Sequence, residues 1–463
     1  MPKNEGVALS LGEVHGSVTT RKTGSWLRRF LSFAGPGYLV SVGYMDPGNW
    51  ATDLAGGAKF GYALIWVILL SNLMAIFLQT LCVRLGVASG RDLAQACRDR
   101  YSKPVSVVLW VLCEIAIIAC DLAEVIGSAV ALNLLFGLPL VAGVLITGFD
   151  VMLLLAAMHF GFRKIEAIVL TLVATVAVCF GLQLVLAQPE WGPLMKGMLV
   201  PTMPNHEAFY IALGILGATV MPHNLYLHTA LVQTRDIGSS VDNKRRAIHY
   251  NTVDTAVALG AAFFVNAAIL VVAAAVFHRS GNYDVSELQE AHRLLAPLLG
   301  APIASTAFAV ALLASGQSST VTGTLAGQIV MEGFLHIRIR PWLRRLITRL
   351  LAIIPAIILI TASGGKNTVD LLVFSQVVLS MQLSFAIFPL MAFTSNKEMM
   401  GEFANPLWVK VVGYSICTLI ASLNLWLLFG AIGPYWMGLL VAAGGAFTVW
   451  VRYFYRGGKT CTA

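Results

Sequence analysis

Long apolar segments, separated by short polar ones, fill most of this chain of 463 residues. A helix that spans a membrane needs roughly 18 or more apolar residues, and segment after segment reaches that length. The pattern predicts twelve such helices, at about residues 30–58, 61–83, 104–135, 138–158, 165–188, 207–232, 253–277, 302–334, 343–362, 367–393, 407–429 and 434–455. The chain is therefore expected to be an all-α, polytopic membrane protein.

The first of these segments is interrupted at its centre by residues 43–49, with the sequence GYMDPGN. A carboxylate at the middle of a bilayer costs roughly 2.5 to 3.5 kcal/mol on insertion scales, and Pro47 removes a backbone donor beside Asp46. We expect the helix to unwind here, so that Asp46, Asn49 and freed carbonyls face a bound cation instead of lipid. The alternative is an ordinary helix N-cap at Asp46 followed by a first-turn proline.

A second interruption matches the first. Residues 44–49 and 219–224 share a proline and an asparagine at the same offsets. They lie in the first helix of two five-helix sets, at about residues 30–188 and 207–393, and the second set is expected to cross the membrane in the opposite direction. Inverted repeats of this kind are typical of transporters, whose substrate site lies where the two broken helices meet.

Charge favours one orientation of these helices. With the N-terminus in the cytoplasm, all but five of the 31 lysines and arginines fall in cytoplasmic segments, as the positive-inside rule requires. The five outer residues are Lys59, Lys196, Arg279, Arg293 and Lys366. Both termini are then cytoplasmic, and we expect a multi-pass protein of the cell (inner) membrane. The basic excess is a solvated feature beside the lipid, and it implies no nucleic-acid partner.

Composition and motifs exclude several other classes. The polar tail at residues 1–29 lacks the apolar core and small-residue cleavage site of a signal peptide. The seven cysteines form no CxxC pair, so neither a disulfide nor a zinc cluster is implied. An intramembrane metal hydrolase is excluded by the absence of an HExxH motif. We therefore expect no enzyme activity and no cofactor, a transporter core at residues 30–395, and a C-terminal part at residues 396–463 that holds the last two helices.

The two interruptions together offer a mixed set of donor atoms. Asp46 supplies a carboxylate oxygen, Asn49 an amide oxygen, and the unwound turn at residues 218–221 backbone carbonyls, whereas Met221 adds a thioether. Oxygen suits Mg²⁺, Ca²⁺ and Mn²⁺ and sulfur favours softer ions, so the mixture indicates borderline cations such as Mn²⁺ and Fe²⁺. An amino-acid substrate would need helix N-termini without a fixed anion beside them. Taken alone, Met221 is better explained as a packing residue, but its place opposite Asp46 in the repeat favours ligation.

These two motifs, together with residues 316–328 (GQSSTVTGTLAGQ), resemble the Nramp divalent-metal transporters, particularly the bacterial manganese importers. The resemblance covers the first ten predicted helices. It implies a LeuT-like fold and proton-coupled uptake of Mn²⁺, Fe²⁺ and Cd²⁺ by alternating access, with metal ions and protons as substrates and no required oligomer. The metal site that the resemblance implies consists of Asp46, Asn49, Met221, the carbonyls near Ala218 and Gly43, and Gln376 nearby.

Three carboxylates share one face of the predicted helix at residues 104–135. Glu114, Asp121 and Glu124 are seven and three residues apart, and carboxylates within a membrane are costly unless they are paired or wet. Arg344 and Arg345, near the cytoplasmic start of residues 343–362, are the expected partners. The family resemblance implies a polar proton pathway from these groups to Asp46. A static salt-bridge network with snorkelling arginines is the alternative.

The sequence allows more than one role for two histidines and for a run of small residues. His223 and His228 are five residues apart, so they face different sides of a helix and do not share a metal. Either one relays protons or gates, or both are ordinary buried histidines. The glycines, serines and threonines of residues 316–328 are expected mainly to permit close helix packing.

Two other functions remain as alternatives. A passive metal channel is one, although paired broken helices at mid-membrane are typical of transporters. The other is a transporter of the same fold that carries Mg²⁺ or an organic cation. Met221 argues against Mg²⁺ or an organic cation as the transported substrate, because its sulfur contributes nothing to binding a hard ion.

Overall fold

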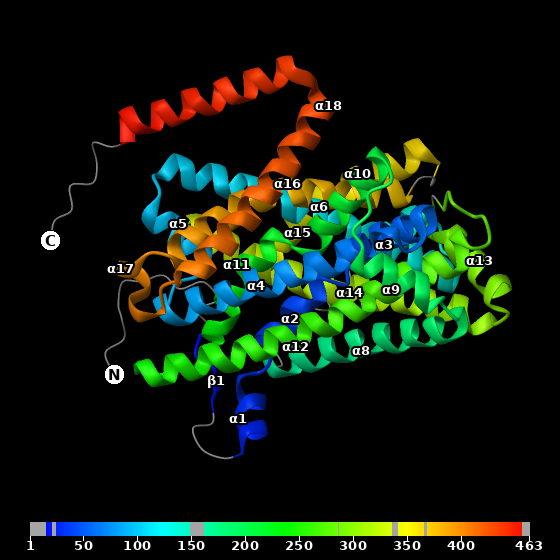
Figure 1. Ribbon diagram of the computed structural model, residues 1–463, viewed down its shortest axis with the longest axis horizontal. Coiled ribbons are helices and arrows are strands. Elements are labelled where there is room, and N and C mark those ends of the chain that lie inside the picture. Colours follow the sequence, from blue (N-terminus) through cyan, green and yellow to red (C-terminus); the bar gives the residue numbers. More distant parts are fainter. Residues whose placement is uncertain are drawn as a thin grey trace.

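The computed structural model describes residues 15–20, 25–148, 162–285, 287–335, 341–364 and 368–455. Most of them form long helices that run back and forth along one common direction, which is horizontal in Figure 1. Seven helical stretches of this described part are long and apolar enough to cross a membrane: Pro47–Ser89, Lys103–Phe136, Glu166–Ala187, His206–Thr234, Val241–His278, Thr368–Thr394 and Leu407–Gly430. The predicted all-helical architecture is confirmed.

The first predicted membrane helix is broken where its sequence indicates. It consists of α2 (Pro36–Gly43) and α3 (Pro47–Phe60), with Tyr44, Met45 and Asp46 between them. The break has a local cause, because Asp46 is the N-cap of α3 and its side chain accepts a hydrogen bond from the Asn49 backbone N–H at 2.9 Å. Pro47 occupies the first turn, where its missing N–H costs nothing.

The sixth predicted helix is broken in the same way. It consists of α10 (His206–Thr219) and α11 (Pro222–Leu231), with Val220 and Met221 between them. Met221 is the N-cap of α11, and Pro222 follows it in the first turn. The chain runs from α2 to α3 in one direction and from α10 to α11 in the other (Figure 1). The two broken helices of the predicted inverted repeat are therefore present and antiparallel.

The remaining long helices lie close to their predicted positions, with a few shifted ends. They are α4 (Ile65–Ser89), α6 (Lys103–Phe136), α8 (Phe162–Ala187), α12 (Val241–Ala273), α14 (Pro302–Leu335), α15 (Pro341–Ser363), α16 (Thr368–Thr394) and α18 (Leu407–Tyr455). Of the helix predicted at 138–158, residues 140–148 are helical and residues 149–158 lie outside the described part. The start of α12 is well before the predicted residue 253, because its polar first turns continue the helix beyond the apolar segment.

Helices 11 and 12 of the prediction form a single element. Residues 407–455 are one continuous helix, α18, which turns sharply back on itself in Figure 1. The apolar pattern separates the two halves at residues 430–433, just before Pro434, and the helical assignment continues through this position. The number of membrane crossings in this part therefore depends on the bend rather than on a loop.

Short elements connect the long helices and were not marked by the apolar pattern, since none reaches membrane-spanning length. They are α1 (Trp26–Phe33), η1 (Gly61–Leu64), α5 (Leu93–Arg100), α9 (Trp191–Leu199), η2 (Val232–Thr234), η3 (Ala274–His278), α13 (Leu288–Leu299), α17 (Lys397–Met400) and η4 (Gly401–Phe403). Two short parallel strands, β1 (Val18–Thr19) and β2 (Arg235–Asp236), pair the tail with the end of the second broken helix. The predicted tail boundary, at residue 29, falls inside α1.

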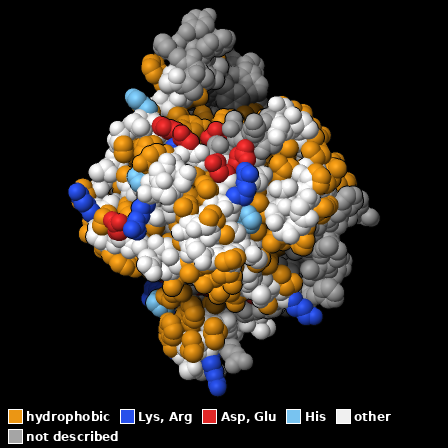
Figure 2. Space-filling model, turned by 90° about the vertical axis from the view of Figure 1, so that its right-hand side faces the viewer, with side chains coloured by type: hydrophobic (Ala, Val, Ile, Leu, Met, Phe, Trp, Pro, Cys, Tyr) orange, Lys and Arg blue, Asp and Glu red, His pale blue; other side chains and the backbone are white. Residues whose placement is uncertain are grey.

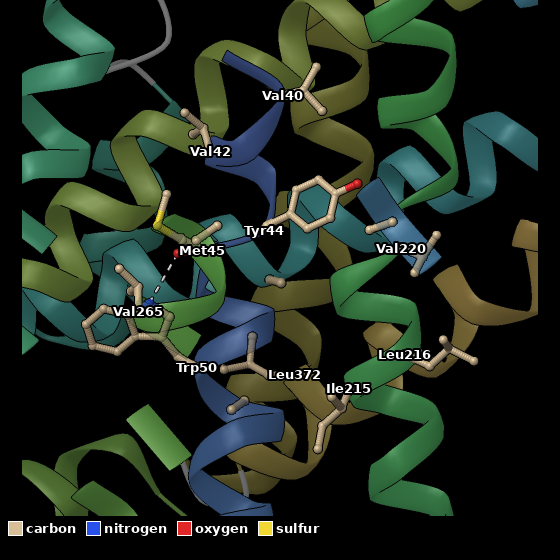
Figure 3. Packing of buried hydrophobic residues seen from close by; sticks show 14 of the residues in the cluster. Val40, Val42, Tyr44, Met45, Trp50, Ile215, Leu216, Val220, Val265 and Leu372 are labelled. Atoms are coloured by element: carbon tan, nitrogen blue, oxygen red, sulfur yellow. Dashed lines mark hydrogen bonds between the residues drawn. The ribbon is translucent and has the colours of Figure 1, made fainter. Parts of the chain in front are cut away.

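The unwound segment after α2 is held inside the hydrophobic core (Figure 3). The indole N–H of Trp50 donates to the carbonyl of Met45 at 3.2 Å, and the Trp50 ring packs edge-on against Phe180 and Phe308. Trp50 is only 1% exposed. A carbonyl freed by the break is thereby satisfied within the protein, as it must be at membrane depth.

Candidate metal site

The two helix breaks meet at the side chain of Asn49. Its amide nitrogen donates to Asp46 Oδ1 at 2.7 Å, to the carbonyl of Ala218 at 3.1 Å and to the carbonyl of Gly43 at 3.3 Å. One of these oxygens comes from the end of α2, one from the start of α3 and one from the last turn of α10. Three oxygens from both halves of the repeat thus converge on one buried point.

The orientation of Asn49 differs from the expected one. The sequence suggests that its amide oxygen faces a cation, whereas here the oxygen accepts a hydrogen bond from Asn266 Nδ2 at 3.3 Å. Asn266 lies on α12 and also donates to the carbonyl of Tyr44 at 2.7 Å. A half-turn of the Asn49 amide would bring its oxygen to the point where the other three oxygens converge. In the present orientation, the amide nitrogen and not the oxygen of Asn49 faces the other three oxygens.

The two carboxylate oxygens of Asp46 have different surroundings. Oδ1 caps α3, as the ordinary N-cap interpretation requires. Oδ2 lies 3.9 Å from the sulfur of Cys120 on α6. Because the side chain is completely buried, its charge is exposed only to the groups that line the break.

Met221 lies beside this carboxylate at the second break. Its side chain is fully buried and packs in a small apolar cluster with Ala116, Cys120 and Leu379. Its sulfur accepts a hydrogen bond from Asn224 Nδ2 at 3.7 Å. The thioether is therefore fixed by neighbours on three helices.

Two close approaches hold the remaining predicted residues at the site. A Cβ atom at Gly43 would lie 2.2 Å from Asn224 Nδ2, and one at Gly48 would lie 1.8 Å from Gln376 Nε2, so a larger residue at either position would displace the facing amide. Gln376, on α16, is fully buried, and its Oε1 has no hydrogen-bond partner among the described residues. The six residues assigned to the metal by the family resemblance thus lie around the same two breaks.

The proton-pathway candidate Glu124 pairs with Arg349, a residue that was not among the predicted partners. Arg349 on α15 donates to Glu124 Oε2 at 3.2 Å, and both side chains are at most 1% exposed. Thr320 donates to the same oxygen at 3.0 Å. The other oxygen of Glu124 lies 3.9 Å from Cys120 Sγ, the atom that also faces Asp46. Cys120 therefore lies between the candidate metal site and a buried ion pair.

The expected partners Arg344 and Arg345 have side chains outside the described part of the structure. The signal for Arg349 is present in the sequence, since it is an arginine within an apolar segment and not at its end. It was instead counted with the solvated cytoplasmic residues. Arg235 is a second exception to that interpretation, because it is 2% exposed and pairs with Glu166 at 2.9 Å.

The other pathway candidates have separate surroundings. Asp121 is fully buried and interacts electrostatically with His223, whose Nδ1 has no partner among the described residues. Glu114 is partly buried and accepts a hydrogen bond from the indole of Trp110 at 3.1 Å.

His228 belongs to a different group from His223, as the spacing indicates. Its Nδ1 lies 2.9 Å from Gln79 Oε1, and Gln79 Nε2 donates to the hydroxyl of Tyr44 at 3.0 Å. Tyr44 is the first residue of the helix break. His228 is thus linked to the unwound segment through one glutamine of α4.

A charged hollow of about 350 Å³ opens at the end of α3. Its lining includes Lys59, Glu207, Asp284 and Asp370. Lys59 pairs with Glu207 and lies 3.8 Å from Asp284. Figure 2 shows acidic side chains gathered beside basic ones on this face. The hollow lies on the side that the charge pattern predicts to be extracellular.

Comparison with known proteins identifies the family of this chain. Residues 37–430 match the family model described as natural resistance-associated macrophage protein-like, or Nramp. The chain belongs to the Nramp family. Members of this family are transporters and not enzymes, so the chain is a multi-pass membrane transporter, as the sequence predicts.

Curated Nramp relatives and solved structures match nearly the whole chain. Proteins named divalent metal cation transporter MntH are 60% identical in Nostoc sp. (91% of this chain and 96% of that protein) and 58% identical in Agrobacterium fabrum (93% and 94%). A crystal structure of the Eremococcus coleocola manganese transporter is 38% identical, with a TM-score of 0.85, over 95% of this chain and 96% of the other. Mhp1, a nucleobase-cation-symport-1 transporter, shares the fold alone, at 16% identity, a TM-score of 0.57 and coverage of 84% and 89%. The predicted LeuT-like fold is confirmed.

Proposed function

We propose that this Nramp chain is a secondary active importer of Mn²⁺, which also carries Fe²⁺ and Cd²⁺, couples uptake to protons and works by alternating access. The observation that carries the proposal is the convergence of three oxygens, from Asp46, Gly43 and Ala218, on one buried point between the two helix breaks. The names of the bacterial relatives support a divalent metal as cargo. The metal is substrate in this proposal, and no resident cofactor is needed.

The donor set favours a borderline transition metal over a hard ion. Asp46, two carbonyls and the amide of Gln376 provide oxygen, a half-turn of the Asn49 amide would add another oxygen, and Met221 provides sulfur. Mg²⁺ demands near-ideal octahedral oxygen coordination and gives up its water reluctantly, whereas Mn²⁺ and Fe²⁺ accept mixed shells. This chemistry argues against the alternative cargo of Mg²⁺, and the fixed carboxylate does not by itself favour an organic cation.

We also propose that protons travel through the buried groups around Asp46. Cys120 lies between Asp46 and Glu124, and Arg349 holds Glu124 in place. Asp121 and His223 form a second titratable pair on the adjoining faces of α6 and α11. Arg344, Arg345, Glu114 and His228 remain candidates for the cytoplasmic end of the pathway. The static alternative, in which these groups only neutralise one another, predicts no proton movement.

Uptake into proteoliposomes tests cargo and coupling together. We expect purified protein to accumulate Mn²⁺ against its gradient and to acidify the interior, as reported by a pH-sensitive dye enclosed in the vesicles. A passive channel would equilibrate Mn²⁺ without accumulation. Accumulation without any pH change would retain the metal transporter and reject proton coupling.

A selectivity prediction follows from Met221. Replacing Met221 with alanine removes the thioether and leaves space for a water, so hard ions can keep an oxygen shell. The Met221→Ala variant should still transport Mn²⁺, bind Cd²⁺ more weakly and gain transport of Ca²⁺ or Mg²⁺, measured as competition with Mn²⁺ uptake. Met45→Ala is the control, since Met45 is buried in the first break and is not a proposed ligand. If excess Ca²⁺ competes no better in Met221→Ala than in the wild type, cavity size rather than sulfur sets selectivity.

We also propose the domain boundaries and the membrane orientation that the sequence predicts. The tail is residues 1–29, the transporter core residues 30–395, and the C-terminal part residues 396–463. We propose an inner-membrane location with both termini in the cytoplasm, on the basis of the lysine and arginine distribution. No oligomer is required, because every proposed ligand comes from one chain.

A further inference from the structure

We propose that Cys120 supplies a second sulfur to the metal site and strengthens its preference for thiophilic cations such as Cd²⁺ and Zn²⁺. The inference rests on the proposed function, since it concerns the same site. Cys120 belongs to the small apolar cluster that also contains Met221. The thiol and the thioether therefore lie in one cluster between α6, α11 and α16. Met221 and Cys120 come from different helices, and no sequence motif pairs them.

The geometry places this sulfur within reach of an ion held by Asp46. Cys120 Sγ lies 3.9 Å from Asp46 Oδ2. A zinc ion lies about 2.3 Å from a sulfur ligand and about 2.1 Å from a carboxylate oxygen. A thiolate sulfur and an oxygen that are 3.9 Å apart can therefore contact one ion together, once the thiol has passed its proton to a carboxylate such as Glu124, whose Oε1 lies 3.9 Å from the sulfur. The carboxylate oxygen concerned is Oδ2, whereas Oδ1 caps α3.

Two buried amide oxygens beside the sulfurs also point to a ligand. Gln376 Oε1 and Asn224 Oδ1 have no hydrogen-bond partner among the described residues, and both side chains are completely buried. Asn224 contacts Met221 through its nitrogen, and Gln376 packs against Gly48, two residues after Asp46. A buried acceptor without a donor is costly, and a cation would satisfy such an oxygen. The site therefore combines two sulfur atoms with two amide oxygens that have no hydrogen-bond partner among the described residues.

Two sulfur ligands change the relative affinity of the site for different metal ions more than a single sulfur ligand does. Soft donors favour Zn²⁺ and Cd²⁺ over Mn²⁺, while carboxylate, carbonyl and water ligands suit Mn²⁺. With Met221 alone, the site distinguishes transition metals from Ca²⁺ and Mg²⁺. With Cys120 added, it also distinguishes thiophilic ions from Mn²⁺ itself. We therefore expect Cd²⁺ to compete with Mn²⁺ more strongly here than Met221 alone would allow.

The test measures Cd²⁺ competition with Mn²⁺ uptake in proteoliposomes. Cys120→Ser keeps a hydrogen-bonding side chain of similar size and removes the sulfur, and we expect the Cd²⁺-to-Mn²⁺ preference to fall about tenfold, the lower end of the effects that changes around a bound metal produce. Cys113→Ser is the matched control. Cys113 is buried seven residues earlier on α6, and its replacement should leave the preference unchanged. Cys120→Ala serves as the second variant if the serine protein does not fold.

X-ray absorption of the Cd²⁺-loaded protein gives a readout that a merely structural role would not change. The wild type and Cys113→Ser should show two sulfur neighbours of cadmium, and Cys120→Ser and Met221→Ala should each show one. A single sulfur in the wild type, or an unchanged preference in folded Cys120 variants, overturns the inference while Mn²⁺ uptake still supports the transporter. Absence of Mn²⁺ uptake by the wild type would instead overturn the proposed function.

Discussion

Asp46→Ala is expected to abolish metal binding and uptake while the protein still folds. Asp46 is the one carboxylate among the proposed ligands, and the carbonyls of Gly43 and Ala218 cannot neutralise a divalent charge alone. Removing the side chain also removes the N-cap of α3, which costs about 1 kcal/mol in a typical helix. Mn²⁺ binding by calorimetry and uptake by proteoliposomes should both fall below detection, whereas thermal unfolding should shift only modestly.

Two further variants separate the loss of charge from the loss of the cap. Asp46→Asn retains a good N-cap and removes the charge, so it should be as inactive as the alanine variant but more stable. Asp92→Ala removes the N-cap of α5, where Asp92 and Gln95 form a capping box, and it should lower stability without affecting uptake. Normal Mn²⁺ uptake by folded Asp46→Asn would refute the site assignment.

Neutralising Glu124 and Asp121 together is expected to reduce acidification driven by Mn²⁺, with metal binding largely retained. Both carboxylates are fully buried on α6, and neither is a proposed metal ligand. Glu124→Gln leaves the charge of Arg349 uncompensated, and breaking a buried ion pair in this way typically costs about 3–5 kcal/mol. We therefore expect a clear drop in thermal stability beside the loss of proton movement.

A compensated variant distinguishes a proton role from damage to the fold. Adding Arg349→Met to Glu124→Gln removes the unpaired charge, so stability should recover while acidification stays low. Glu402→Gln is the control, because Glu402 is exposed and its pairing with Arg245 is a surface contact. Full acidification in a stable Glu124→Gln/Asp121→Asn protein would favour the static salt-bridge network over the pathway.

The sequence by itself determined the features that depend on neighbouring residues. Apolar length predicted the helices, and Pro47 and Pro222 predicted the breaks, because a proline and its preceding residue disturb a helix wherever they occur. Asp46 was identifiable as both N-cap and ligand candidate for the same local reason. Where no local signal exists, the prediction was less accurate, as at the polar start of α12.

Only the tertiary structure decided which side chains meet across helices. Arg349 pairs with Glu124, and Asn266 donates a hydrogen bond to the Asn49 oxygen. Cys120 reaches both Asp46 and Glu124. These contacts depend on the rotation and depth of α6, α12 and α15 against the broken helices. Packing of the whole bundle fixes that rotation and depth, because the contacts join residues that are far apart in the sequence.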